Sequence, residues 1–358
     1  MTLSPPTPTL DLSHLKTSAD EVLDGFLVRK AAARTPDLPD LATSLRRFIA
    51  VGGKRIRPLF TLVGWHAAGC NGTVRAAHHL AASLELFHAF ALIHDDVMDR
   101  SDTRRGHPTV HRHFAQQHAG LPAAAEQFGT GAAILVGDLA LMWSDELLHT
   151  GNLTPQQLAA VRPLLNKMRT EVIQGQYLDL NLDWRRHQQP DVQAALTVIR
   201  YKTAKYTIER PLQLGAALAG APPTLLAALS AYAIPLGEAF QLRDDLLGVF
   251  GDPATTGKPA LDDLREGKAT VLIALALTRA RRAQADQLRL FLGCPTLTEE
   301  QAQVARRIIT ASGAVRTVET MIAERYEQAQ AALDTAPIDP AVKDALHRLA
   351  DTAVRRRT

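Results

Sequence analysis

Apolar residues recur at spacings of three and four along almost the whole chain of 358 residues, which is the spacing of an amphipathic helix. Ala and Leu dominate these runs, and Pro and Gly collect between them, where helices end. The alternation of apolar and polar residues that marks a strand is nearly absent, and so is a linker rich in Pro, Gly or Ser. We therefore predict a single all-α domain over residues 15–358, preceded by a disordered segment over residues 1–14.

The periodic runs and their breaks also predict where the helices lie. We expect helices over residues 15–33, 40–51, 55–70, 74–100, 108–118, 122–149, 154–181, 190–219, 223–249, 269–283, 298–312, 314–334 and 339–355. The polar stretches 183–190 and 251–267 are predicted to be loops.

The charges of the chain nearly balance, with 40 Lys and Arg against 37 Asp and Glu, which argues against nucleic acid or an acidic membrane as a partner. Two cysteines, Cys70 and Cys294, are too few for a disulfide framework and are typical of a reduced compartment. Residues 1–11 lack the features of a signal peptide, and the most apolar stretches, such as 130–143 with its Asp138, are short and interrupted. We therefore expect a cytoplasmic protein without a transmembrane segment.

Two Asp-Asp pairs lie inside apolar runs of helical spacing. The first is Asp95-Asp96, followed by Asp99, and the second is Asp244-Asp245. On a helix Asp95 and Asp99 share one face, so their carboxylates converge and repel each other unless a cation lies between them. Oxygen ligands favour a hard ion such as Mg²⁺, which proteins usually hold with one or two carboxylates and substrate phosphates. Two such clusters facing each other would clamp a diphosphate through shared Mg²⁺.

Further motifs accompany these clusters in a fixed order between residues 40 and 275. They are GGKRIRP at 52–58, ELFH at 85–88, the first Asp cluster with RRG at 104–106, GQYLD at 175–179, KT at 202–203, and FQ at 240–241 before the second Asp pair. This order resembles the trans-type polyprenyl diphosphate synthases, most of all those that form geranylgeranyl diphosphate. The resemblance implies a bundle of about ten core helices around a deep central cavity, assembled as a homodimer.

The resemblance also implies a metal-dependent reaction between isopentenyl diphosphate and an allylic diphosphate. Asp95, Asp99 and Asp244 would hold three Mg²⁺ ions, and Asp96 would act in catalysis with them. These ions would stabilise the negative charge that develops as the allylic diphosphate leaves. The side-chain carbonyl of Gln241 and the backbone at Lys202-Thr203 would face the resulting carbocation.

The basic residues of the motifs divide into two groups by the same resemblance. Lys54 and Arg57 follow a Gly-Gly turn where backbone can approach an anion closely, and an Arg side chain can hold phosphate oxygens in bidentate fashion. The residues assigned to isopentenyl diphosphate are Lys54, Arg57, His88 and Arg105. Those assigned to the allylic diphosphate are Arg104, Lys202 and Lys258.

Product length is predicted from the residues that precede the first Asp cluster. Phe90 and Ala91 stand five and four positions before Asp95, where relatives of the resembled family place the floor of the hydrocarbon pocket. A single aromatic residue there favours a C20 product, with C15 or longer chains as alternatives. On a helix Ala91 lies under Asp95, whereas Phe90 is turned away from it.

Several features keep other interpretations open. A class I terpene cyclase shares the implied fold, and a noncatalytic regulatory subunit would share most motifs. The second Asp cluster has Gly248 where the family pattern has a third Asp; we expect Asp252 or Asp262 to compensate and Gly248→Asp to be tolerated. Gly137-Asp138, Gln176 and Asp179 match family positions but suit helix packing equally well, and residues 355–357 suit a solvated tail or a cap on the site.

Overall fold

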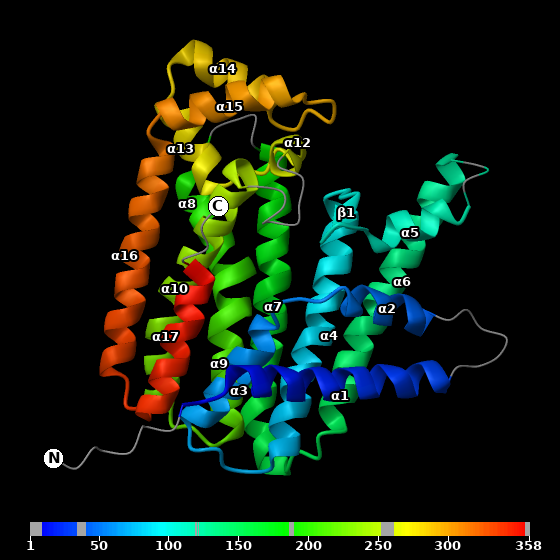
Figure 1. Cartoon of the computed structure of the whole chain (residues 1–358), viewed down its shortest axis with the longest axis vertical. Helices are drawn as coiled ribbons and strands as arrows, with labels where there is room; N and C mark the ends of the chain where they lie inside the picture. The colour runs from blue at the N-terminus through cyan, green and yellow to red at the C-terminus, as the bar shows by residue number, and fades with distance from the viewer. Residues whose placement is uncertain are drawn as a thin grey trace. The chain divides into compact units, whose positions relative to one another are not determined.

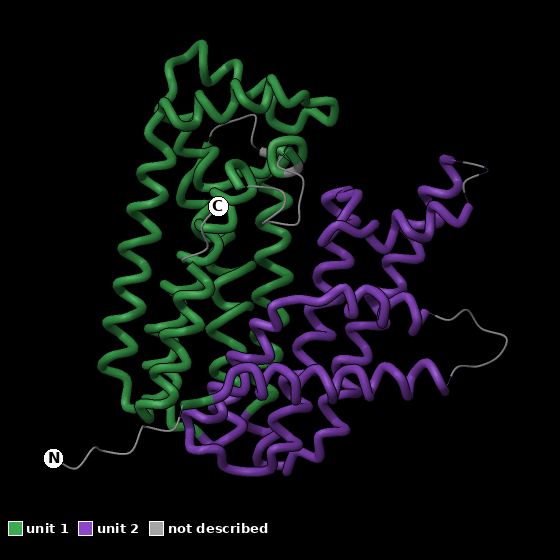
Figure 2. Tube along the Cα trace, in the orientation of Figure 1, with its two compact units in different colours: residues 1–10, 161–214, 221–358 green, residues 11–160, 215–220 purple. Residues whose placement is uncertain are grey.

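A computed structural model describes residues 9–33, 41–118, 120, 122–185, 190–251 and 261–354. Most of these residues are helical, which confirms the all-α class (Figure 1). The chain divides into two compact units, coloured separately in Figure 2: unit 1 contains residues 1–10, 161–214 and 221–358, and unit 2 contains residues 11–160 and 215–220. Each unit has its own core, and the single domain of residues 15–358 stays a prediction.

Unit 2 is built around one long buried helix, α4 (Val74–Met98), which packs against α1 (Leu12–Ala32), α3 (Ile56–Ala67) and α6 (Pro122–His149). The other elements of this unit are α2 (Leu41–Ala50), β1 (Thr103–Arg104), β2 (His107–Pro108) and α5 (Val110–Gln116). The side chain of Thr73 caps α4 by accepting a hydrogen bond from the N–H of Ala76. Leu80, Leu84 and Ile93 are fully buried along α4, so this helix forms the core of the unit.

Unit 1 is built around α10 (Pro223–Phe250), which packs against η1 (Ile199–Glu209), α13 (Val271–Arg279), α16 (Ala314–Thr335) and α17 (Pro340–Val354). The remaining helices of this unit are α8 (Val192–Val198), α12 (Asp262–Glu266), α14 (Arg282–Phe291) and α15 (Glu299–Ala311). Two further helices, α7 (Pro155–Arg185) and α9 (Arg210–Leu218), contribute most of their residues to it. Tyr232 is the largest fully buried side chain and donates to the C=O of Leu346 at 2.8 Å.

The predicted helices are present, most with ends shifted by a few residues, and several further features differ from the prediction. Helix α1 begins at Leu12, inside the segment predicted to be disordered, because the Asp11 side chain accepts hydrogen bonds from the first free N–H groups. The helix predicted over 269–283 is two helices, α13 and α14, separated by extended backbone at Ala280. The short helix α12 and the hairpin of β1 and β2 lie in stretches that were predicted to be loops or left unassigned.

The helix predicted over 190–219 contains an unexpected change of helix type. Its central part, η1, is a π-helix of 11 residues, whereas π-helices are usually single turns and often mark functional sites. A Cβ built on Gly175 of α7 would stand 2.6 Å from the backbone nitrogen of Lys202, and one on Gly237 of α10 would stand 2.4 Å from the Cα of Ala204. The π-helix is therefore held between two glycines, one on each neighbouring helix.

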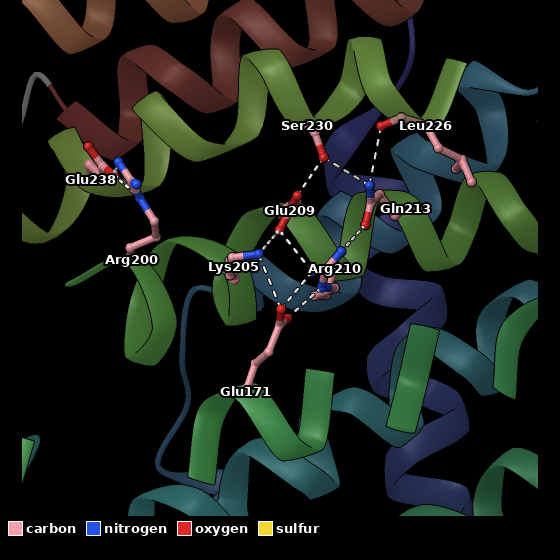
Figure 3. A network of polar contacts seen from close by, with 9 residues as sticks. All are labelled: Glu171, Arg200, Lys205, Glu209, Arg210, Gln213, Leu226, Ser230 and Glu238. Atoms are coloured by element: carbon pink, nitrogen blue, oxygen red, sulfur yellow. Dashed lines mark hydrogen bonds and ion pairs between the residues drawn. The ribbon is translucent and has the colours of Figure 1, made fainter. Parts of the chain in front are cut away.

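A network of buried charges fastens the end of this π-helix (Figure 3). Glu171 of α7 accepts hydrogen bonds from Arg210 at 2.8 and 2.9 Å and from Lys205 at 3.2 Å. Burial alone would raise the pKa of Glu171, but the hydrogen bonds and charges of Arg210 and Lys205 lower it. Ser230 of α10 donates to Glu209 at 2.5 Å, so the network ties η1 to both neighbouring helices.

Among the described residues, two helices, α4 and α10, are long and apolar enough to cross a membrane by length and composition, contrary to the expectation that no segment qualifies. In the structure, 78% of the apolar window of α4 and 56% of that of α10 are buried inside the protein. The core helices of soluble proteins pass the same test, so these two helices are weak evidence for a membrane span.

Candidate active site

The first Asp cluster lies at the C-terminal end of α4. Asp99 caps the helix, and its N–H donates to the C=O of Asp95 at 2.8 Å. Asp95 and Asp99 are half-buried and share one helix face, as their spacing predicts, whereas Asp96 is 1% exposed. The three carboxylates therefore divide into a partly exposed pair and one buried member.

The buried member holds Arg104. The Nε of Arg104 donates to both carboxylate oxygens of Asp96, at 2.8 and 2.9 Å, and its Nη2 lies 2.6 Å from Asp96 Oδ1 but 3.7 Å from Asp95 Oδ2. Burial would lower the pKa of Arg104, but the ion pair with Asp96 raises it. The hairpin that carries Arg104 turns at Arg105 and Gly106, both with positive φ. Asp96 thus positions a cation next to the exposed pair.

Several cations gather around His88, which precedes Asp95 by two helical turns. Burial, followed by the charges of Arg57, Arg105 and Arg104, lowers the pKa of His88 well below its usual range, so this side chain is neutral at pH 7. Burial also lowers the pKa of Arg105, with a contribution from the neighbouring arginines. A region in which cations depress each other's pKa favours an anion. Arg57, His88, Arg104 and Arg105 are therefore brought together within unit 2.

Arg55 is a residue that the sequence analysis missed. It has a φ of 51°, is 9% exposed, and donates to Asp20 at 2.6 Å, to Glu85 at 2.8 Å and to the C=O of Ile49 at 3.2 Å. Glu85 belongs to the ELFH motif, and a carboxylate there signals a partner for one of the nearby arginines. Arg55 therefore anchors the loop that carries Lys54 and leads into α3, the helix of Arg57.

The same loop approaches the RRG hairpin closely. A Cβ built on Gly53 would stand 3.1 Å from Arg105 Nη2 and 3.1 Å from Arg55 Nη1. This spacing is tighter than almost all real side-chain contacts, so glycine allows the loop to lie against both guanidinium groups. Lys54, the next residue, is exposed.

The second Asp pair lies on α10 and belongs to unit 1. The hydroxyl of Thr203 donates to the side-chain carbonyl of Gln241 at 2.7 Å, and the amide of Gln241 donates to Asp245 at 2.8 Å. Lys202 of the π-helix forms an ion pair with Asp179 of α7 at 2.6 Å. The structure thus brings Lys202, Thr203, Gln241 and the second Asp pair together, and fixes the orientation of the Gln241 amide.

Negative charge is concentrated around Asp245. Burial, together with the neighbouring carboxylates of Asp263, Asp244 and Asp179, raises the pKa of this carboxyl from 3.8 to about 7, against the hydrogen bond from Gln241. A bound cation would relieve this repulsion. Asp244 itself is half-buried, so its carboxylate is accessible to an ion.

The carboxylates suit Mg²⁺ in donor type, because all are oxygen ligands. In the described part of the chain, no group of three or more His, Cys, Asp or Glu side chains is arranged as a ready metal site. Mg²⁺ commonly needs only one or two carboxylates, since phosphates and water complete its coordination. Asp95 with Asp99 in unit 2, and Asp244 in unit 1, fit this mode of binding.

The two residues predicted to set product length differ in their surroundings. Phe90 is 7% exposed and packs edge-on against His94 with ring centroids 4.8 Å apart, and against Phe87 at 5.3 Å. His94 lies over Gly137 of α6, where a Cβ would stand 2.3 Å from its Nε2. Gly137 therefore serves close helix packing. Ala91 is only partly buried.

Three parts of the predicted site are not placed by the structure. Lys258, Asp252 and residues 355–357 lie outside the described residues, and nothing is described of the side chain of Asp262. The two Asp clusters belong to different units, so their facing each other across a cavity stays a prediction.

Comparisons with known proteins place the chain among enzymes. Residues 39–310 match the family model of polyprenyl synthetases. The crystal structure of geranylgeranyl pyrophosphate synthase from Corynebacterium glutamicum, complexed with isoprenyl diphosphate and magnesium, is 43% identical; it covers 97% of this chain and 100% of its own length, with a TM-score of 0.92.

Two curated relatives give the same result. A geranylfarnesyl diphosphate synthase from Aeropyrum pernix is 34% identical over 90% of this chain and 95% of its own length. A geranylgeranyl diphosphate synthase from Mycobacterium tuberculosis is 35% identical over 76% of this chain and 73% of its own. The chain therefore belongs to the polyprenyl synthetase family.

Proposed function

We propose that the protein is a Mg²⁺-dependent prenyltransferase that joins allylic diphosphates head-to-tail with isopentenyl diphosphate, with geranylgeranyl diphosphate (C20) as its main product. The observation that carries this proposal is the end of α4, where the Asp95 and Asp99 pair adjoins arginines gathered around a neutral His88. Carboxylates that can bind a metal ion therefore lie next to arginine side chains that can bind a diphosphate. The relatives named as geranylgeranyl, geranylfarnesyl and farnesyl diphosphate synthases support the reaction class.

The residues of the chain would prepare the allylic diphosphate to leave. Three Mg²⁺ ions, held by Asp95, Asp99 and Asp244, would supply positive charge to the departing diphosphate. Arg104, fixed by Asp96, and Lys202, fixed by Asp179, would donate to the same oxygens. Lys258 is assigned to this group by resemblance alone. Cations already fixed in position need no reorganisation as charge develops.

The allylic cation that remains would be met by dipoles rather than nucleophiles. The carbonyl of Gln241 is oriented by Thr203 and Asp245, so its oxygen can face positive charge without rotating away. The double bond of isopentenyl diphosphate would then form the new carbon–carbon bond. The C–O bond of the allylic diphosphate breaks, and a proton of the extended cation passes to the released pyrophosphate.

Isopentenyl diphosphate would bind at the loop after α2. Lys54 is exposed there, and Arg57 and Arg105 lie in the cationic region around His88. A neutral imidazole can donate one hydrogen bond to the diphosphate without adding a further charge. Phe90, with Ala91 one position nearer the metal, would form the floor that limits growth at C20.

We further propose that the protein is a cytoplasmic homodimer. On α6, Phe128, Leu135 and Met142 are 49%, 59% and 66% exposed and recur every seven residues, which places them on one helix face. On α7, an exposed apolar row follows helical spacing: Ile173, Tyr177, Leu180 and Trp184. Exposed apolar faces of this kind are typical of subunit interfaces.

Assay of the purified chain tests the function directly. With isopentenyl diphosphate, Mg²⁺ and dimethylallyl, geranyl or farnesyl diphosphate in turn, chromatography of the products should show mainly C20 chains. Asp95→Ala and Asp244→Ala should each reduce kcat by orders of magnitude, because their carboxylates act mainly on the transition state. A cyclised product would indicate a terpene cyclase, and activity only with a second protein would indicate a regulatory subunit.

A further inference from the structure

Gly248 stands four residues after Asp244 on α10 and therefore on the same helix face. A Cβ built on Gly248 would stand 1.6 Å from Oδ2 of Asp263 and 2.6 Å from its Cγ. Real Cβ atoms never approach other atoms this closely. The carboxylate of Asp263 thus occupies the space into which a side chain at position 248 would extend.

Asp263 comes from the short helix α12, which is fixed by packing on its far side. Leu264 is 1% exposed, and its C=O accepts a hydrogen bond from the N–H of Gly293 at 2.9 Å. Arg265 donates to the C=O of Leu297 at 2.9 Å. These contacts hold α12 in place against α10, so the position of the Asp263 carboxylate is set by buried structure.

We propose that Asp263 is the third carboxylate of the second Asp cluster, supplied from α12 because α10 has glycine at position 248. With Asp244 it would hold the divalent cation that contacts the diphosphate. This inference rests on the proposed function of the second cluster. It assigns a metal-holding role to a residue outside the Asp-Asp motif, and it explains why the chain has no side chain at Gly248.

Only one of the two positions, 248 or 263, can carry the third carboxylate. An aspartate at 248 and the present aspartate at 263 require the same space, and two carboxylates in contact also repel each other. Gly248→Asp alone should therefore be harmful, which reverses the expectation that it is tolerated. Gly248→Asp together with Asp263→Gly moves the third carboxylate from α12 to α10 and removes the collision.

Titration calorimetry of the full-length protein with inorganic pyrophosphate, with and without excess Mg²⁺, tests this assignment without relying on turnover. Asp263→Asn keeps the size of the side chain and removes its charge; it should weaken the Mg²⁺-dependent affinity by about tenfold or more. Asp286→Asn on α14 is the matched control, because it makes the same charge change at an exposed carboxylate paired with Arg289, and it should leave this affinity unchanged. Thermal denaturation confirms that each variant is folded.

The exchange of positions gives the sharper result. Gly248→Asp should bind pyrophosphate at least as weakly as Asp263→Asn, and the double variant Gly248→Asp/Asp263→Gly should recover to within about threefold of the wild type. Wild-type affinity in Asp263→Asn, an equal loss in Asp286→Asn, or no recovery in the double variant would each overturn the proposal. Failure of the wild type to form prenyl products would instead refute the proposed function, since the calorimetry does not require turnover.

Discussion

At the end of α4, neighbouring carboxylates have different partners, and their substitution should separate stability from turnover. Asp96→Asn leaves the half-buried Arg104 without its closest counter-charge, which should lower the free energy of unfolding by on the order of 3 kcal/mol and raise the KM for the allylic substrate. Asp95→Asn, one residue away, should lower kcat and change stability little. Urea denaturation and steady-state kinetics of both variants measure the contrast. Equal stability in Asp96→Asn and the wild type would contradict it.

Asp245 should make the stability of the metal-free protein depend on pH. Its pKa is about 7 in the folded protein and 3.8 as a free group, so the folded state holds the proton more tightly. This proton stabilises the folded state fully below about pH 4. As the pH rises, the free energy of unfolding falls by at most about 1.4 kcal/mol per pH unit, and the stabilising effect is lost once the pH passes 7. Asp245→Asn should remove this part of the slope in denaturation curves measured from pH 5 to 8. An unchanged slope in Asp245→Asn would show that Asp245 does not titrate in this range.

Phe90 and Ala91 should have opposite effects on product length. Phe90→Ser removes a ring from the proposed floor, and a longer chain gains about 0.8 kcal/mol per buried CH₂ once space exists, so products longer than C20 should appear. Ala91→Phe adds a ring beneath Asp95 and should give C15 or C10 products. Chromatography measures both. Loss of stability in Phe90→Ser with unchanged products would mean that Phe90 serves only the Phe87 and His94 packing.

Sequence reasoning found residue types more readily than pairings. The spacing of Asp95 and Asp99 is enough to place them on one helix face. It does not show that Asp96 holds Arg104, because this pair depends on a hairpin that brings two segments together. Arg55 belongs to the GGKRIRP motif but was given no role, because the sequence does not show that its side chain faces Asp20 and Glu85.

Among the elements, the π-helix η1 depends on the two glycines beside it. Gly175→Ala and Gly237→Ala should each destabilise the protein by about 1–3 kcal/mol, because a methyl group would meet the backbone of η1. Both should also weaken allylic substrate binding, since η1 carries Lys202 and Thr203. Gly25→Ala of α1 is the matched control: its Cβ would meet only an Arg29 side-chain atom at 3.5 Å.

Denaturation curves and the KM values for the two substrates decide this prediction. The control should be neutral or slightly stabilising, as expected for Ala in a helix. Variants of Gly175 and Gly237 that behave like the control would show that η1 can shift without cost.

The helices themselves were largely predictable from the sequence, and the changes within them were not. Long apolar runs with Pro and Gly at their ends fix the type of most elements. The change to a π-helix within residues 190–219 depends on how closely α7 and α10 approach its backbone, and no local sequence pattern predicts this approach. The break at Ala280 was missed because the residues around it have good helix propensity.

For the whole molecule, the exposed apolar rows on α6 and α7 predict self-association. Leu135→Glu places a charge in the proposed interface, where it would be buried without a partner, and should convert dimers to monomers in sedimentation experiments. Leu290→Glu is the matched control, because Leu290 of α14 is 77% exposed but has no apolar row beside it among the described residues. An unchanged sedimentation coefficient for Leu135→Glu, or dissociation of both variants, would argue against this interface.

Over the same few turns, helix α7 has an exposed apolar row for the proposed subunit interface and other residues that contact the π-helix or its cations. Its exposed row, which includes Tyr177, alternates with Glu171, Gly175 and Asp179, which touch the π-helix or its cations. A partner subunit that steadied the outer row would therefore steady the support of Lys202 as well. Dilution that dissociates the dimer should then lower the specific activity, which is the rate per mole of enzyme, as well as the total rate.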